Sequence, residues 1–294
     1  MDFKQLNTFL TVVNCGSFTK AADKLYLSQP TISAHISALE RELNKKLIAR
    51  TTKRVEVTHD GMILLEYAKK LLQIKENMLE ALSDSEKKAI HIGASTTPSA
   101  YILPKLLPGY LKQHSNVRFT VSQGDSRSVA EGLTEGIMDI GLIGIQPQND
   151  SLISVPFCRD RLILITPVNE YFLSLRDRSI QPDFISIFNN NPIITRELGS
   201  ATRKSSENVL SELGIAADSL KIAAELNDCE AISRMVAGGL GIAIVSEFAI
   251  DDRSHDLLSF ELPVESANRE LYLIYRTNEQ FKPIVRDFIS YLLQ

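Results

Sequence analysis

Residues 17–37 hold two helical patterns separated by three residues: Ser-Phe-Thr-Lys-Ala-Ala-Asp-Lys-Leu-Tyr-Leu-Ser-Gln-Pro-Thr-Ile-Ser-Ala-His-Ile-Ser. Ser17 is a favourable N-cap for the first helix. The apolar residues that follow it recur at the spacing of one buried helical face, and they are Phe18, Ala21, Ala22 and Leu25. The small alanines allow another helix to approach closely. The stretch therefore predicts a helix-turn-helix.

The second helix is expected to begin after Ser28, with Pro30 in its first turn, where the missing N–H is tolerated. Its predicted inward face is Ile32, Ile36, Leu39 and Leu43. The side chains left on the outward face are Gln29, Thr31, Ser33, His35 and Ser37. We expect these five side chains to reach DNA base edges, and we include Pro30 among the DNA-binding residues. An earlier amphipathic segment, with Leu6, Phe9, Leu10 and Val13 in register, supplies a third helix.

A basic stretch follows the second helix and predicts a small β-hairpin over residues 47–57. The basic residues in and beside it are Lys45, Lys46, Arg50, Lys53 and Arg54. A wing of this kind would lie along the sugar-phosphate backbone, and we expect Arg50, Lys53 and Arg54 to contact phosphates. The alternative is that the three helices form an ordinary soluble bundle, and the basic hairpin weighs against it.

Charge is divided unevenly along the chain. Residues 1–60 contain nine Lys and Arg against six Asp and Glu, a net charge of +3. Because the 294-residue chain has 32 basic and 36 acidic residues, the remainder holds 23 against 30, a net charge of −7. Only the N-terminal part therefore favours a polyanion, and the length suggests about two domains. No apolar leader or membrane-spanning run is evident, so a cytoplasmic protein without a membrane partner is expected.

Metal, cofactor and catalytic motifs are absent from the sequence. Cys15, Cys158 and Cys229 have no metal-ligand spacing and receive no role. There is no Gly-x-Ser-x-Gly, no His-Glu-x-x-His and no phosphate loop, and the five histidines are scattered. We therefore predict no enzyme activity, no metal and no cofactor. A small-molecule effector is the only ligand expected.

Residues 58–89 predict a long amphipathic helix, because Gly61 is their only glycine and they contain no proline. A heptad-like seam runs through Leu65, Ala68, Leu72, Lys75, Leu79 and Leu82. Either this stripe packs on its own chain, or a second copy covers it. Dimerisation is favoured, because a DNA-binding protein with one short recognition helix usually needs a second copy to contact two half-sites. Residues 61–88 are the predicted dimerisation linker between residues 1–60 and 89–294.

From residue 89 the chain alternates between strand and helix patterns. The first series is a strand at 89–94, a helix at 102–112, a strand at 117–121, a helix at 128–135 and a strand at 139–143. The second is a strand at 192–195, a helix after Ser200, a strand at 220–225, a helix after Asp228 and a strand at 241–245. A strand at 271–275 and a helix at 280–293 follow. These patterns predict two α/β lobes, one of about 89–165 with 266–294 and one of about 166–265.

Small hydroxyl residues stand at the C-terminal ends of the predicted strands, where helix N-termini offer unpaired N–H groups to ligands. The predicted effector-binding residues are Ser95, Thr96, Thr97, Ser99, Gly124, Gly144, Arg196, Ser200, Thr202, Arg203 and Asn227. Taken singly, each Ser or Thr is more simply explained as an N-cap. Their concentration in both lobes, with two arginines beside one group, favours a cleft for a small polar or anionic ligand. A solute-binding protein without sequence-specific DNA binding is the competing interpretation.

The residues of Phe9–Glu42 resemble the N-terminal signature of LysR-type transcriptional regulators. The matching positions include Phe18, Ala21, Ala22, Leu25, Ser28, Gln29, Pro30, Ser33, His35, Ile36, Leu39 and Glu40, and the likeness continues through Leu47, Arg50, Thr58 and Gly61. The resemblance extends over the whole chain and implies a winged helix-turn-helix, a linker helix and a two-lobed effector domain like that of periplasmic binding proteins.

The same resemblance implies a homotetramer, built as a dimer of dimers, that binds double-stranded promoter DNA and bends it. A co-inducer in the cleft would close one lobe against the other and so change the spacing of the recognition helices. RNA polymerase is a further partner that the resemblance admits. The motifs at 101–104, 199–203 and 238–242 are similar to members that govern sulfur, selenium or inorganic carbon assimilation. Position 34, where many members carry arginine, is Ala34, which leaves base contacts to the neighbouring polar residues.

Overall fold

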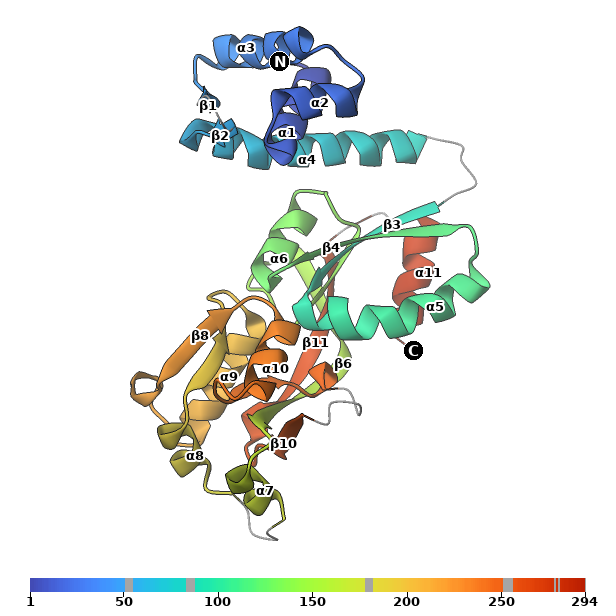
Figure 1. Ribbon diagram of the computed structural model, residues 1–294. Coiled ribbons are helices and arrows are strands. Elements are labelled where there is room, and N and C mark those ends of the chain that lie inside the picture. The colour runs from blue at the N-terminus through green and yellow to red at the C-terminus, as the bar shows by residue number, and fades with distance from the viewer. Residues whose placement is uncertain are drawn as a thin grey trace. The chain divides into compact units, whose positions relative to one another are not determined.

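The computed structural model describes residues 1–50, 55–82, 88–177, 182–250, 256–277, 279 and 281–293. It divides into two compact units, Met1–Ser85 and Glu86–Gln294 (Figure 1). The division lies between residues 85 and 86, and the domain limits expected from the sequence stay a prediction. Within the described ranges, none of the helices combines the length and the apolar character that a membrane span requires.

The N-terminal unit is a winged helix-turn-helix. Its elements are α1 (Phe3–Cys15), α2 (Phe18–Leu25), α3 (Gln29–Leu43), β1 (Ile48–Arg50), β2 (Val55–Val57) and α4 (His59–Leu82). Both predicted N-caps are confirmed, since Ser17 Oγ accepts from Lys20 N and Ser28 Oγ accepts from Thr31 N. The wing strands pair antiparallel, with Ile48 opposite Val57. The predicted wing residues Lys53 and Arg54 lie outside the described residues.

The core of this unit comes from the predicted helical stripes. Leu6, Phe9, Ala21, Ile32, Ile36 and Leu39 are buried in one cluster. The prediction for Leu43 is wrong, because its side chain is 37% exposed. Leu43 is the last residue of α3, and the helix ends there at Asn44 in the left-handed conformation. The side chain thus lies past the core that the other residues fill.

Helix α4 packs part of the predicted seam on its own chain. Ala68 is buried in the core of the unit, Leu65 and Leu72 pack against that core, and the Lys75 Nζ lies 5.2 Å from the centre of the Phe3 ring. A different apolar stripe stays exposed, formed by Ile63, Tyr67, Leu71, Ile74 and Met78. The seam residues up to Lys75 therefore pack on their own chain and not on a second copy.

The C-terminal unit begins with the predicted βαβαβ series. Its elements are β3 (Lys88–Ser95), a π-helical turn (Pro98–Ile102), α5 (Leu103–Gln113), β4 (Val117–Gly124), α6 (Ser126–Thr134) and β5 (Ile140–Ile143). Strand β3 pairs parallel with both β4 and β5, so the C-terminal ends of these strands lie at one edge. Ser95 lies opposite Gly124 in the register.

The second series is also present. It consists of α7 (Glu170–Arg176), α8 (Phe184–Asn190), β7 (Ile193–Arg196), α9 (Ala201–Glu212), β8 (Ile222–Leu226), α10 (Cys229–Ala237) and β9 (Ala243–Ser246). Strands β7 and β8 are parallel, and a parallel bridge from Ile193 to Ile242 joins β7 to the segment that leads into β9. Helices α7 and α8 were not predicted from the sequence. Short 3-10 turns lie at Ala217–Ser219, Glu247–Ala249 and Glu265–Ala267.

Two long strands connect the two series. The sequence patterns did not predict β6 (Leu152–Pro167), which pairs antiparallel with β11 (Asn268–Arg276) through its first part and with β9 and β10 (Leu257–Glu261) through its second. The closing helix α11 (Pro283–Leu292) packs Val285 and Phe288 into the core around β3. A separate core around Leu164, Phe188 and Ile244 fills the other half. Two smaller clusters add to these cores. The separation of the cores agrees with the two predicted lobes, whose exact limits stay a prediction.

Candidate functional site

The N-terminal part of α3, from Gln29 to Ser37, presents polar side chains to solvent. Gln29, Pro30 and Ser37 are exposed, and Thr31 and Ser33 are half-buried. Gln29 Nε2 donates to Ser33 Oγ at 3.2 Å, and the hydroxyls of Ser28 and Thr31 share a hydrogen bond of 2.8 Å. Because these contacts lie within one helix turn, they orient the side chains while leaving donors and acceptors available for base edges. Five of the predicted DNA-contacting residues thus lie together on one exposed segment.

His35 lies on another flank of α3 from Gln29 and Ser33, against α1. Thr8 Oγ1 donates to Lys4 O at 2.7 Å and lies 2.9 Å from His35 Nδ1. Since the single hydroxyl hydrogen of Thr8 is used by Lys4, we infer that His35 Nδ1 carries hydrogen and donates to Thr8. The structure therefore ties His35 to α1, although sequence reasoning grouped it with the freely exposed residues.

Glu40 joins the recognition helix to the wing, a role that the sequence did not reveal. Its Oε1 accepts from Leu47 N at 3.0 Å and from Ile48 N at 3.3 Å, and its Oε2 accepts from Lys46 Nζ at 2.7 Å. Burial alone would raise the pKa of Glu40, but these hydrogen bonds outweigh it and lower the pKa. The wing is thereby fixed relative to α3. Arg50 ends β1, but its side chain, like Lys53 and Arg54, is outside the described part of the chain.

The strand ends of the C-terminal unit meet in a nearly filled cleft. A cavity of only ≈ 10 Å³ lies there, and among its lining residues are the predicted Ser95, Thr96, Thr97, Gly144, Arg196, Ser200 and Thr202. Four predicted residues do not line it. Asn227 lines a neighbouring cavity of ≈ 710 Å³ together with Thr96. Arg203 lines another cavity, of ≈ 960 Å³, between α6 and α9. Ser99 and Gly124 line none of these three cavities.

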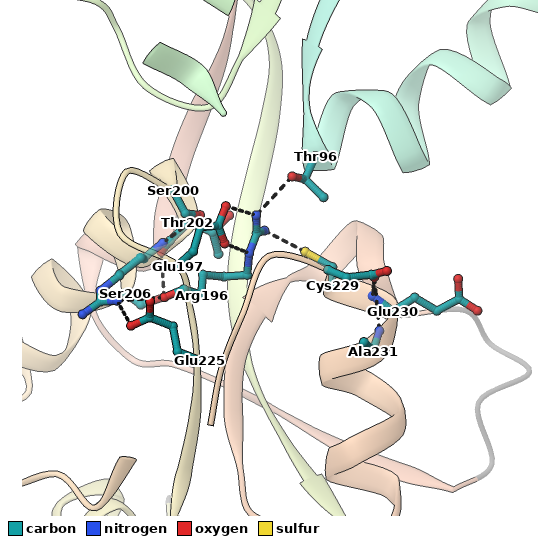
Figure 2. Close-up of polar contacts among 12 residues, drawn as sticks. Thr96, Arg196, Glu197, Ser200, Thr202, Ser206, Glu225, Cys229, Glu230 and Ala231 are labelled. Carbon is teal, nitrogen blue, oxygen red and sulfur yellow. Dashed lines mark hydrogen bonds and ion pairs between the residues drawn. The ribbon is translucent and has the colours of Figure 1, made fainter. Parts of the chain in front are cut away.

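Arg196 is the centre of this cleft, and its side chain is 4% exposed (Figure 2). Its Nε and Nη2 donate to the two carboxylate oxygens of Glu197 at 2.8 and 2.9 Å. Nη2 also donates to Thr96 Oγ1 at 3.1 Å, and Nη1 donates to Cys229 Sγ at 2.9 Å. Burial opposes the charge of Arg196, but the hydrogen bonds that it donates to Glu197 outweigh burial and raise its pKa. The guanidinium thus connects the strand end after β3 to β7 and α10.

A second buried ion pair, which the sequence did not reveal, lies beside the first. Arg269 of β11 donates from Nε and Nη2 to Asp160 of β6 at 2.7 and 2.6 Å, and from Nη1 to Thr202 Oγ1 at 3.2 Å. Asp160 also accepts from Ser246 Oγ at 2.7 Å and is fully buried. The only sequence signal was a carboxylate between two arginines, at 159–161, close to an apolar run. Both cations of the cleft are therefore paired with carboxylates of the protein.

Arg203 is paired on the outer side of β7. Its Nη1 donates to Glu225 at 2.6 Å and to Arg196 O at 3.0 Å, and its Nε donates to Glu207 at 3.1 Å. The hydrogen bond to Glu225 is the main cause of the raised pKa of Arg203. The N-cap explanation is correct for Ser200, whose Oγ accepts from Arg203 N. For Thr96 and Thr202, the hydroxyls accept hydrogen bonds from the cleft arginines instead.

The neighbouring cavity of ≈ 710 Å³ is lined by two groups of raised pKa. Burial raises the pKa of Tyr101 to about 12, with smaller contributions from Cys229 and Glu230. Burial also raises the pKa of the Cys229 thiol, which the nearby Arg196 opposes. Tyr101, Gln123 and Asn227 give this cavity neutral polar groups next to Thr96.

Comparison with protein families places a known domain on each unit. Residues 3–62 match the bacterial regulatory helix-turn-helix protein, lysR family, and residues 83–294 match the LysR substrate binding domain. The second match alone covers well over half of the chain. The two matches follow the division that the structure shows.

Individual proteins and solved structures agree with these matches. The chain is 33% identical to the "Probable RuBisCO transcriptional regulator" of Cyanidioschyzon merolae over 282 residues, 93% of this chain and 91% of the relative. It is 30% identical to an HTH-type transcriptional regulator of Methanocaldococcus jannaschii over 97% of this chain and 96% of that one. The fold resembles CbnR in complex with its target DNA, with a TM-score of 0.77, 21% identity and 99% of both chains covered.

A helix-turn-helix with exposed polar side chains and an α/β unit with a polar cleft thus agree with the two family matches and with the fold of CbnR. The chain belongs to the LysR family of DNA-binding transcriptional regulators.

Proposed function

We propose that this regulator binds a small polar effector in the cleft of its C-terminal unit and that the effector changes its binding to promoter DNA. The observation that carries the proposal is the arrangement at Thr96. This residue lines both the nearly filled cavity of ≈ 10 Å³ and the adjoining cavity of ≈ 710 Å³. An effector in the larger cavity would thus reach a hydroxyl that is bonded to Arg196. Any displacement of that contact alters how the strand ends of the two lobes are joined.

The proposed effector-binding residues differ in where they lie and in how they would act. Thr96, Tyr101, Gln123 and Asn227 line the cavity of ≈ 710 Å³, and Arg196, Ser200 and Thr202 line the cavity of ≈ 10 Å³. Arg203 is proposed to act through β7, since it bonds to the carbonyl of Arg196. An anionic effector, as the sequence suggested, has to compete with carboxylates that already neutralise the cleft cations.

A second copy of the chain is proposed as a partner. The exposed apolar stripe on α4, formed by Ile63, Tyr67, Leu71, Ile74 and Met78, follows a spacing of three and four residues. A matching helix from another copy would cover this stripe, and two recognition helices would then contact two half-sites of a dyad. Assembly of two such dimers into a tetramer, and contact with RNA polymerase at the promoter, follow from the family resemblance.

The proposed target genes serve assimilation of an inorganic nutrient. The relatives called "Probable RuBisCO transcriptional regulator" support inorganic carbon assimilation as the first group of promoters to test. The competing function is that of a sensor that binds a small solute without sequence-specific contact to DNA.

Genome-wide capture of fragments bound by the purified full-length protein tests the proposal. We expect a discrete site upstream of an operon. In a gel shift on that site, Gln29→Ala should remove the preference for the captured sequence while binding to unrelated DNA is kept. Gln113→Ala, which changes an exposed glutamine in the other unit, is the matched control. Equal loss on all DNA from Gln29→Ala would contradict the role of α3, and absence of enrichment from a folded protein would favour the solute sensor.

A further inference from the structure

The pairing of Arg196 with its sequence neighbour Glu197 has the geometry of ligand recognition. Two parallel N–H groups of the guanidinium meet two carboxylate oxygens at 2.8 and 2.9 Å, the fork arrangement by which arginine binds free carboxylates and other oxyanions (Figure 2). The guanidinium is almost completely buried, whereas 26% of the Glu197 side chain is exposed. The carboxylate is therefore the partner that has access to solvent.

Glu197 is held only by this one interaction. Across the described residues, its carboxylate accepts hydrogen bonds from Arg196 alone. Asp160, the carboxylate that pairs with the other arginine of the cleft, is held more firmly, because its side chain is fully buried and accepts hydrogen bonds from both Ser246 and Arg269. Rotation of the Glu197 side chain toward solvent would break two hydrogen bonds and expose the fork of Arg196. Asp160 has no exposed surface through which its side chain could rotate in the same way.

The cleft also holds an unused donor. Ser126 Oγ is one of the buried side-chain atoms that lack a hydrogen-bond partner in the described part of the chain, and Ser126 is 5% exposed. Ser126, Arg196 and Glu197 line the same cavity of ≈ 10 Å³. This volume barely admits one water molecule. If the Glu197 carboxylate rotated out, it would leave a space of carboxylate shape beside the guanidinium.

We propose that Glu197 acts as a built-in competitor, which occupies with its own carboxylate the subsite where a small oxyanion binds Arg196. This inference rests on the proposed effector cleft and specifies the chemical class of its ligand. The oxyanion can bind only to molecules in which Glu197 is rotated out. The apparent dissociation constant is therefore the intrinsic constant divided by the fraction of such molecules. While it occupies the subsite, Glu197 also neutralises the buried guanidinium, since an unpaired buried charge is strongly destabilising.

Formate tests the proposal, because it is the smallest carboxylate that fits the fork. The full-length Glu197→Ala variant is melted in sodium chloride and in sodium formate at equal ionic strength. In chloride, its Tm should fall below that of the unaltered protein because Arg196 has lost its partner. Formate should raise the Tm of the variant by roughly 3–5 °C for each tenfold increase above its dissociation constant, while the unaltered protein shifts by less than about 1 °C.

Two control variants locate the effect. Glu225→Ala removes a carboxylate from Arg203, whose side chain is 22% exposed and which keeps Glu207, so formate should give no specific rescue. The double variant Arg196→Lys with Glu197→Ala lacks the fork and should lose the response to formate. Equal rescue of Glu225→Ala, or rescue that survives in the double variant, would overturn the proposal.

A second measurement keeps the test decisive if Glu197→Ala does not fold. Glu197→Gln preserves the shape of the side chain but removes its charge. Binding of ¹³C-formate, followed by NMR, should be at least about tenfold tighter to Glu197→Gln than to the unaltered protein, because the internal competitor is weakened. Equal dissociation constants would sink the idea. Neither readout involves DNA, so failure of the proposed promoter regulation and failure of this inference are separately visible.

Discussion

The recognition helix α3 leaves its polar side chains exposed, whereas the cleft between β3 and β7 pairs its polar side chains with one another. Gln29 and Ser37 face solvent, while Arg196 and Asp160 are buried and bonded within the protein. The two ligands explain the contrast. DNA is a large rigid polyanion, which is bound best by a preformed surface of free donors and acceptors. A small effector cannot fill a cleft until the cleft exchanges internal partners for it.

The largest expected effect comes from the buried pair of the cleft. Asp160→Asn removes the charge that compensates Arg269, and we expect the free energy of unfolding to fall by about 3–5 kcal/mol. Urea unfolding of the full-length protein measures it. The matched change in the other region, Ser37→Ala on the exposed face of α3, should stay within about 0.5 kcal/mol. Similar losses from both variants would remove the contrast between the two regions.

Glu40 is the exception in the DNA-binding unit, since it is a carboxylate bonded as fully as those of the cleft. Glu40→Gln should lower the free energy of unfolding by about 1–3 kcal/mol, because the hydrogen bonds from Lys46, Leu47 and Ile48 lose a charged acceptor. The pKa of Glu40 is lowered from its ordinary 4.5 in the folded protein. Its stabilisation is thus fully present above pH 4.5 and is lost as the pH falls through the folded-state pKa.

Unfolding at neutral pH and at about pH 3.5 checks this pH dependence. The unaltered protein should lose more stability between the two conditions than Glu40→Gln does. An identical loss in both proteins would show that Glu40 is not the titrating group. Weaker binding of nonspecific DNA by the variant would further indicate that the wing depends on this carboxylate for its position.

The helix-turn-helix was predictable because its information is local. Ser17 and Ser28 cap their helices at the predicted positions, and the core residues recur within single turns. The face of α4 that packs on the chain was harder, because two apolar stripes run along the helix and only tertiary contacts decide between them. The predicted burial of Leu43 was wrong for a related reason, because helical periodicity does not show where a core ends.

Strand β6 escaped prediction because Pro156 and the charges at 159–161 interrupt its apolar pattern. The buried charge of Asp160 is compatible with a strand because Arg269, 109 residues away in the chain, pairs with it. The cleft shows the same limit. Its hydroxyls were predictable from the strand ends, but the pairing of Arg196 with Glu197 depends on side-chain conformation, which sequence adjacency does not determine.

A change at the partner of His35 tests whether a polar side chain on α3 can be bonded within the protein, as those of the cleft are. Thr8→Val removes the acceptor of His35 Nδ1 while it keeps the shape of the side chain. We expect a loss of about 1 kcal/mol in unfolding free energy, together with a changed chemical shift of the His35 ring in NMR spectra. Ser33→Ala, on the flank away from α1, is the control and should leave both unchanged. An unaltered ring environment in Thr8→Val would place His35 back among the free DNA-contacting residues.

The smallest effect, and the one of opposite sign, is expected at Tyr26 in the turn before α3. Its backbone adopts the left-handed conformation with φ of 54°, and its side chain is 95% exposed. The phenol therefore gains no packing that offsets the unfavourable backbone conformation, which asparagine adopts more readily. Tyr26→Asn should raise the free energy of unfolding by about 0.5–1 kcal/mol in urea titrations. If the same variant binds DNA more weakly, the exposed ring is part of the preformed surface, and stability has been given up there for contact with the polyanion. A loss of stability would instead mean that the ring packs on the protein and that the exposed surface of α3 is smaller than the structure indicates.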